Sequence, residues 1–405
     1  MSIITIISLV ISLCAIFSFI NFKFFKLPPT IGVMLVSIIF SGLLIGSNYV
    51  GYNFTSHADK ILNQIDFTET VLHGMLGLLL FAGALHVNIN ELAKHKIIIF
   101  ILAFGGTIFS TIAVGLFTYY LLPLFGISIS LIYCLIFGAL ISPTDPIAVM
   151  SILRRAGVSK SLETKVVGES LFNDGIAVVI FLTLLAVLNT GQIDAEREIL
   201  TFVQEFFGGL GIGFAIGYIA FLALKSIDNY QLEILITLAV VMGGYELSRL
   251  LHTSGPIAMV VAGLLIGNVG KRLAMSDKTK QNLDNFWELI DEFLNVALFL
   301  LLGLEILRLT INESAIYSAL IIIPVLLMIR LSAVSLPIIC LRKYIQFSPN
   351  AIKILTWGGL RGGISVALVL SLPNGAERDF LMVITYIIVL FSIFVQGLTV
   401  GKLAK

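Results

Sequence analysis

The chain has 405 residues, of which 58% are hydrophobic and only 12% charged, and its formal net charge is +1. Soluble domains carry about 25% charged residues, so this composition excludes a soluble globular protein and predicts an all-α polytopic membrane protein. A near-neutral chain also gives no reason to expect a nucleic acid as partner. Cys14, Cys134 and Cys340 all lie in apolar runs, so we expect small buried thiols rather than a disulfide or a metal site.

Apolar windows long enough to cross a bilayer recur along the whole chain. A hydrocarbon core of about 30 Å requires roughly 20 apolar residues in a helix. We predict thirteen spanning helices, at residues 3–20, 29–47, 71–87, 97–122, 129–153, 164–189, 201–224, 230–249, 255–270, 286–307, 315–341, 350–372 and 379–400. No loop between them is long enough for a folded domain, so residues 1–405 are expected to form a single membrane domain without a soluble domain.

The Lys and Arg side chains are unevenly distributed between the two sets of span ends. One set of ends carries 18 of them and the opposite set carries 5. Because basic residues collect on the cytoplasmic side, this asymmetry predicts an amino terminus outside and a carboxyl terminus in the cytoplasm.

Five ionisable side chains lie well within the predicted spans: Asp145, Glu169, Asp174, Arg330 and Arg361. Each would oppose insertion by about 2.5 to 3.5 kcal/mol if it faced lipid, so we expect all five to face protein or water. A structural network of ion pairs would satisfy any one of them, whereas the whole set favours a functional site. Glu246, Asp291 and Glu292 lie nearer to span ends, where we expect solvated side chains.

The span at 164–189 reads TKVVGESLFNDGIAVVIFLTLLAVLN and contains two of these acids. Ser170 and Asp174 are four residues apart and share a helical face, and so do Glu169 and Asn173. Glu169 and Asp174 differ by about 140° around the helix axis, so they are not expected to share one ligand. One of the two acids can therefore have a structural role while the other binds an ion.

Two spans carry signals of an interrupted helix. In SPTDP, Pro143 and Pro146 bracket Thr144 and Asp145, and two prolines three residues apart should break the helix. Unwound backbone is tolerated at membrane depth only where protein or a water-filled cavity satisfies it. The second signal is TWGGLRGG, in which four glycines (Gly358, Gly359, Gly362 and Gly363) surround Arg361.

The two interrupted spans occupy corresponding positions in two halves of the chain. Spans one to six (about 1–190) and eight to thirteen (about 230–400) would form two repeats, joined by the seventh span at 201–224. The fifth and twelfth spans are then equivalent, and an offset of seven spans inverts the topology, as in many transporters. We therefore expect crossed discontinuous helices, with Asp145 and Arg361 balancing the charged ends of the half-helices.

The motifs SPTDP, GESLFND and GGLRGG, together with HTSGPIAMVVAGLLIGN at 252–268, resemble those of the monovalent cation/proton antiporters of the NhaP and sodium/proton exchanger class. The resemblance covers essentially the whole chain. It implies an NhaA/NhaP-like antiporter fold, with a core bundle that moves against a dimerisation bundle. A homodimer without cofactors in a cell membrane is implied too, and the short polar carboxyl end suggests a prokaryotic protein.

The resemblance also implies roles for individual residues. Asp174 would carry either the cation or the proton, and Thr144, Asp145 and Ser170 would supply further oxygens. Glu169 would pair with Arg330 and hold the core together, and Asn173 marks the electroneutral branch of the family. Many bacterial relatives have an acid where this chain has Ala82, which puts the detailed coordination in doubt.

We therefore expect an antiporter that exchanges Na⁺ or Li⁺ for a proton, electroneutrally, in sodium transport and pH homeostasis. Oxygen ligands alone do not exclude potassium, so K⁺/H⁺ exchange is an alternative. From other classes, an ion channel and an intramembrane aspartyl protease using Asp145 and Asp174 are rivals. The TDP and FND contexts differ from the Y-D and G-x-G-D patterns of such proteases, which favours transport.

Overall fold

A computed structural model describes residues 3–49, 54, 55, 62, 64, 66–191, 194–310 and 312–404. The regular secondary-structure elements in these residues are all helices. Ten helices in this part of the chain are long and apolar enough to cross a membrane. The three other predicted spans coincide with two interrupted helices and with one helix whose first half is polar. The multi-span, all-helical architecture is thus confirmed, while the count of thirteen stays a prediction.

The longer helices are α1 (Ile3–Ile20), α2 (Pro29–Tyr49), α7 (Gly106–Leu121), α10 (Lys160–Thr190), α11 (Ala195–Lys225), α12 (Tyr230–Leu250), α15 (Asp277–Leu304), α16 (Glu313–Leu341) and α19 (Ala376–Phe391). The shorter ones are α4 (Leu76–His86), α5 (Ile89–Lys94), α6 (Lys96–Phe100), α8 (Leu131–Ile141), α9 (Ile147–Arg155), α13 (Gly255–Leu265), α14 (Lys271–Ala274), α17 (Ala351–Trp357), α18 (Gly363–Leu370) and α20 (Leu398–Ala404). Single π-helical segments extend several of them, such as Glu69–Met75 before α4 and Ile266–Gly270 after α13.

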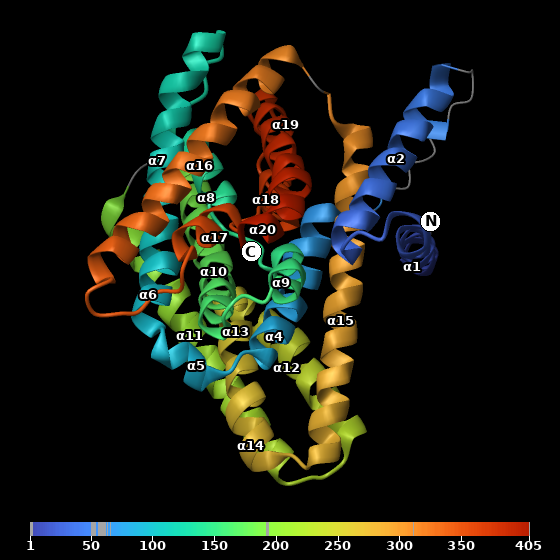
Figure 1. Ribbon diagram of the computed structural model, residues 1–405, viewed down its shortest axis with the longest axis vertical. Coiled ribbons are helices and arrows are strands. Elements are labelled where there is room, and N and C mark those ends of the chain that lie inside the picture. The colour runs from blue at the N-terminus through green and yellow to red at the C-terminus, as the bar shows by residue number, and fades with distance from the viewer. Residues whose placement is uncertain are drawn as a thin grey trace.

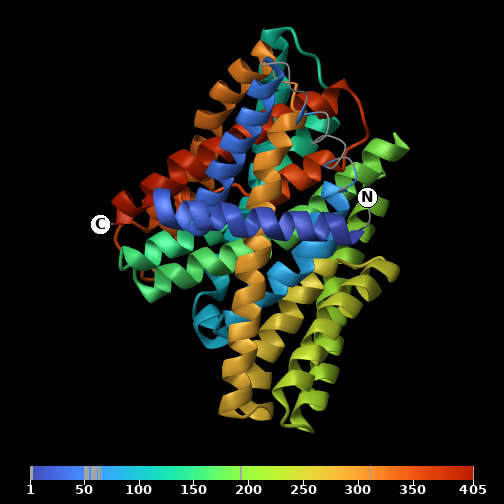
Figure 2. The same cartoon turned by 90° about the vertical axis from the view of Figure 1, so that its right-hand side faces the viewer.

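The helices form two groups along the long axis of the molecule. Helices α11 to α14 gather at the lower end of Figure 1, and α7, α8, α16, α18 and α19 lie toward the upper end. Helix α15 runs along most of the length of the molecule, and α1 crosses it nearly at right angles in Figure 2. Helices α4 and α10 pack between the groups, because α4 contacts α13 and α15 while α10 contacts α8, α11 and α13.

Side-chain caps fix where seven of the described helices begin. The capping side chains, each accepting a backbone N–H of the first turn, belong to Asn88, Ser159, Asp194, Asn229, Ser254, Ser276 and Asn312. Residues of these types are preferred at helix starts because their oxygens replace the missing intrahelical acceptors. The cap at Ser276 places the start of α15 at Asp277, ahead of the predicted start at residue 286.

The outer surface suits lipid. Helix α11 exposes large apolar side chains along its length, among them Ile199, Phe207, Phe214 and Ile219. Contiguous apolar exposure of this kind is unfavourable in water and expected against hydrocarbon. Of the five ionisable side chains expected well within spans, Asp145 is half-buried, and the other four are buried: Glu169, Asp174, Arg330 and Arg361.

The predicted interruptions are present. Helix α8 ends at Ile141 and α9 begins at Ile147, so the SPTDP segment between them is unwound. Likewise α17 ends at Trp357 and α18 begins at Gly363. That the two broken helices cross, and that the halves are inverted repeats, stay predictions.

The cysteine prediction is correct for two residues and wrong for the third. Cys14 and Cys134 are buried, whereas Cys340 on α16 is exposed. An apolar run facing lipid reads the same as one facing the core, so the sequence could not tell these environments apart. The described residues contain no group of three or more potential metal-ligating side chains.

Close packing of α4 against the end of α13 generates a stability prediction. A Cβ atom at Gly267 would lie 2.2 Å from the carbonyl oxygen of Leu85, so Gly267→Ala must push the two elements apart. We expect a loss of about 1 to 3 kcal/mol, the usual cost of overpacking. Thermal unfolding of the detergent-purified protein measures it. Gly243→Ala in α12, where nothing lies within 4 Å, is the control, and equal melting temperatures for the two variants would contradict the prediction.

Candidate cation site

The two unwound segments bond to one another. The backbone N–H of Asp145 donates to the carbonyl oxygen of Leu360 at 2.8 Å. The Arg361 guanidinium donates through Nη1 to the carbonyl oxygens of Ser142 and Pro143, at 2.7 and 2.9 Å. These carbonyls belong to the negative end of α8, where a cation is favourable. These two hydrogen bonds support the expected role of Arg361 as the charge that balances the end of a half-helix.

The Asp145 carboxylate lies at the amino-terminal end of a helix, α18. A Cβ atom at Gly362 would be only 2.5 Å from Asp145 Oδ2, so the carboxylate packs against the residue before α18. The first turn of a helix carries partial positive charge, which suits a fixed negative group. Glycine at position 362 allows this close approach, because a Cβ atom there would force the carboxylate to shift.

Helix α10 holds the SPTDP segment through its amide side chain. Asn173 Nδ2 donates to Thr144 Oγ1 at 2.9 Å, and Thr144 N–H donates to Asn173 Oδ1 at 3.4 Å. The hydroxyls of Thr144 and Ser170 share a further hydrogen bond of 3.0 Å. All three side chains are buried. An aspartate at position 173 could not donate to Thr144, so the neutral amide has a structural reason of its own.

Glu169 and Arg330 form the expected pair. Both guanidinium Nη atoms donate to the carboxylate, Nη1 to Oε1 and Nη2 to Oε2, the latter at 3.0 Å. Nη2 and Nε also donate to the carbonyl oxygen of Leu355, at 3.0 and 3.3 Å, near the end of α17. Glu169 is 1% exposed and Arg330 7%. The bidentate pair joins α10, α16 and α17, and both Glu169 oxygens are engaged by Arg330.

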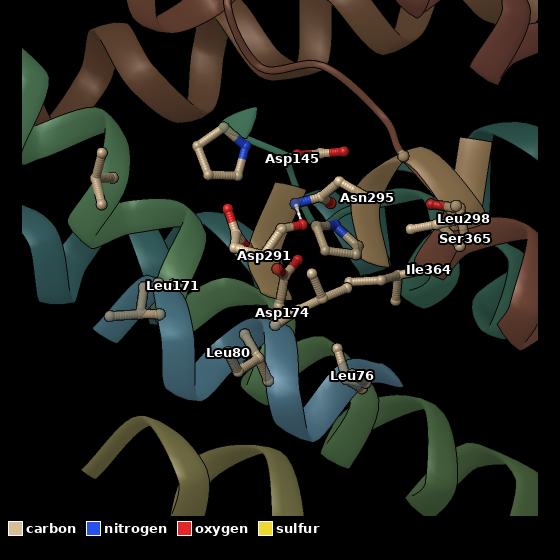
Figure 3. Close-up of a pocket in the computed structure, with 17 residues that line it drawn as sticks. Leu76, Leu80, Asp145, Leu171, Asp174, Asp291, Asn295, Leu298, Ile364 and Ser365 are labelled. Atoms are coloured by element: carbon tan, nitrogen blue, oxygen red, sulfur yellow. Dashed lines mark hydrogen bonds between the residues drawn. The ribbon is translucent and has the colours of Figure 1, made fainter. Parts of the chain in front are cut away.

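A cavity of about 110 Å³ lies beside this junction (Figure 3). Its polar side chains come from four segments, with Asp145 from the break, Asp174 from α10, Asp291 and Asn295 from α15, and Ser365 from α18. The rest of the wall consists of apolar side chains, prolines and glycines. None of the described residues that line it is basic, so the cavity attracts cations.

Asp174 points into this cavity (Figure 3). It is only 7% exposed. Its carboxylate has no hydrogen-bond donor or ion-pair partner among the residues that the structure describes. A buried carboxylate without an internal partner is costly, which makes it available to a proton or a cation.

The structure brings only part of the predicted set to the cavity. Asp145 and Asp174 line it, whereas Thr144 and Ser170 bond to each other outside the lining, so their role as ligands stays a prediction. Ala82 is fully buried in an apolar cluster with Met259 and Ile266. The position therefore packs against α13 instead of lining the cavity.

Sequence reasoning missed the contribution of α15. Asp291 was expected to be solvated near a span end, and this is wrong, because it is half-buried and lines the cavity. The error follows from the late start predicted for α15, whose polar first half does not read as a span. The spacing of four between Asp291 and Asn295, which places both on one helical face, is the signal that could have found them.

The fold and the site define a polytopic membrane protein with a buried acidic cavity at the junction of two broken helices. The sequence profile described as "Sodium/hydrogen exchanger, transmembrane" matches residues 8–405. The chain therefore belongs to the sodium/hydrogen exchanger family.

Individual relatives cover nearly the whole chain. The Na⁺/H⁺ antiporter NhaP of Pseudomonas aeruginosa is 47% identical over 401 residues, which are 98% of this chain and 95% of that protein. The Na⁺/H⁺ antiporter NhaH of Halobacillus dabanensis is 36% identical over 392 residues, 95% of this chain and 93% of the relative. The sodium proton antiporter MjNhaP1 of Methanocaldococcus jannaschii at pH 8 matches with a TM-score of 0.74 at 18% identity, covering 100% of this chain and 99% of that one. At that identity the likeness shows a shared fold.

The Glu169–Arg330 pair generates a prediction about stability. Glu169→Gln leaves the Arg330 guanidinium buried with its charge uncompensated, so we expect a loss of about 3 to 5 kcal/mol. Denaturant unfolding in detergent micelles measures it. The control is Glu246→Gln, which breaks the exposed pair with Arg249 and should cost less than about 1 kcal/mol. If both variants unfold at the same denaturant concentration, the buried pair does not hold the core.

Proposed function

We propose that this protein is a secondary transporter that exchanges one monovalent cation, Na⁺ or Li⁺, for one proton by alternating access, with Asp174 as the carrier. The observation that carries the proposal is the Asp174 carboxylate, which is buried, has no partner among the described residues and is directed into an acidic cavity. Membership of the sodium/hydrogen exchanger family supports it. So do the printed names of the similar proteins, which describe Na⁺/H⁺ antiporters.

The coupling follows from the chemistry of a carboxylate. A proton and a hard cation compete for the same oxygens, and burial disfavours the charged form while a bound cation favours it. An empty, charged carboxylate is expensive in a low-dielectric interior. Only the protonated or the cation-loaded site can therefore move cheaply between the two sides, and each cycle exchanges one ion for the other.

An electroneutral cycle follows if Asp174 is the only acid that changes its charge. Glu169 is compensated by Arg330, and Asn173 is neutral and bonded to Thr144. Asp145 lies against the start of α18, where a fixed negative charge is favourable. One proton is then exchanged for one monovalent cation, and no net charge crosses the membrane.

The setting of this exchange is part of the proposal. The distribution of Lys and Arg supports an outside amino terminus and a cytoplasmic carboxyl terminus. The bacterial source of the similar NhaP and NhaH proteins supports a prokaryotic cell membrane. We further propose a homodimer and two inverted repeats of about residues 1–190 and 230–400. The protein acts as a transporter without a cofactor and not as an enzyme, and its exchange contributes to sodium transport and pH homeostasis.

Removing the carrier should abolish transport. We expect Asp174→Asn to fold but to exchange no cation for protons, because an amide cannot take up and release a proton and has no negative charge to balance that of the cation. Reconstituted vesicles with an entrapped pH dye, given Li⁺, Na⁺, K⁺ and Ca²⁺ in turn, measure this. Asp277→Asn, whose side chain is fully exposed at the start of α15, is the control and should behave like the wild type. Exchange by Asp174→Asn would refute the carrier role, and K⁺ exchange at or above the Na⁺ rate would reassign the cation.

Electroneutrality is tested in the same vesicles. We expect the Na⁺-driven pH change to be independent of an imposed membrane potential, and flux to stop when the sodium gradient equals the proton gradient. A potential-sensitive dye supplies the second measurement. A potential generated by transport, or a balance point that shifts with voltage, would contradict one-for-one exchange.

A further inference from the structure

Helix α15 contributes two polar side chains to the cavity. Asp291 and Asn295 are four residues apart and therefore share a face of the helix. Both line the cavity, together with Asp145 and Asp174 from other segments. Figure 3 shows the four side chains gathered around one space.

The orientation of the Asn295 amide is fixed by a hydrogen bond. Its Nδ2 donates to the carbonyl oxygen of Asp291 at 2.8 Å, which leaves Oδ1 as the free end of the amide. Asn295 is only 2% exposed, and Oδ1 has no donor among the residues that the structure describes. A buried carbonyl oxygen without a donor is rare and costly, so this one requires an explanation.

A purely structural amide in the same helix looks different. Asn282 makes the same kind of bond, in which Nδ2 donates to the carbonyl oxygen four residues earlier, that of Lys278, at 2.8 Å. Asn282 is half-exposed and does not line the cavity, so water can satisfy its Oδ1. Asn295 is instead a buried residue that lines an acidic cavity, and its Oδ1 lacks a donor among the residues that the structure describes.

We infer that Asn295 Oδ1 is an oxygen ligand of the transported cation, and that the Asp291 carboxylate beside it raises the local cation concentration and thereby the affinity. The inference rests on the proposed function. Neutral amide oxygens and carboxylates are the ligands that hard monovalent and divalent cations take in proteins. The amide adds an oxygen without adding a charge, so it strengthens cation binding and leaves one-for-one exchange intact.

The amide also discriminates between the two exchanged ions. A cation needs several oxygens around it, whereas a proton binds to a single carboxylate oxygen. Loss of Oδ1 should therefore weaken binding of the cation and leave the protonation of Asp174 unchanged. The α15 pair is thus a specificity-determining element of the site, distinct from the Asp174 carrier.

The test compares Asn295→Ala with Asn282→Ala in reconstituted vesicles. We expect Asn295→Ala to raise the apparent KM for Na⁺ and Li⁺ by about tenfold, the ratio expected for losing one contact to a charged group. Its maximal rate should stay within about twofold of the wild type, because the carrier is intact. Asn282→Ala should leave both parameters unchanged. Asn295→Asp, which keeps an oxygen at the position, should retain an apparent KM well below that of Asn295→Ala.

A folded Asn295→Ala variant with a wild-type KM would overturn the inference. If that variant fails to fold, Asp291→Asn carries the test. It should raise the apparent KM, more strongly at low ionic strength, while the exposed neighbour Glu292→Gln should not. An unchanged KM in Asp291→Asn then counts against the inference. Absence of exchange in the wild type, or exchange by Asp174→Asn, would instead refute the proposed function.

Discussion

The site depends on one constraint, which is that backbone groups cannot remain unbonded inside a membrane. Two helices of this protein are broken, and the unwound segment of each supplies hydrogen-bond partners to the other. The N–H of Asp145 bonds to Leu360, and the Arg361 guanidinium binds the carbonyls released at Ser142 and Pro143. Neither unwound segment would be stable alone. Their mutual bonding brings charged helix ends to one place, and the acidic cavity lies against that junction.

Helix α10 separates fixed and working polar groups by helical spacing. One face carries Glu169, bound to Arg330, and Asn173, bound to Thr144. These contacts join α10 to its neighbours and give both side chains a bonded partner. Asp174, about 100° further round the helix from Asn173, is left without a described partner. Two acids can be buried on one helix because the charge of Glu169 is compensated by Arg330, so that only Asp174 lacks a described partner.

Much of this arrangement could be read from the sequence. Pro143 and Pro146, and the glycines around Arg361, predict the two breaks because they remove donors and side chains from helices. The Glu169–Arg330 pair came from family resemblance, since nothing in the spacing of α10 and α16 relates two positions so far apart in sequence. The spacing of Asp291 and Asn295 places both on one helical face, but the sequence does not show what that face meets, because this depends on how α15 packs beside α4 and α18. The exposure of Cys340 was missed for a similar reason, because an apolar residue is equally favourable against lipid and in the protein core.

The amide of Asn173 has a consequence for how coupling could evolve. By the family resemblance, the electrogenic branch would carry an acid at this position, whereas here the amide donates the hydrogen bond that anchors Thr144. Replacing it by a carboxylate would add a charge and remove a structural bond in the same step. A change of stoichiometry along this lineage would therefore require a compensating substitution near the SPTDP segment, so that the two positions are expected to vary together.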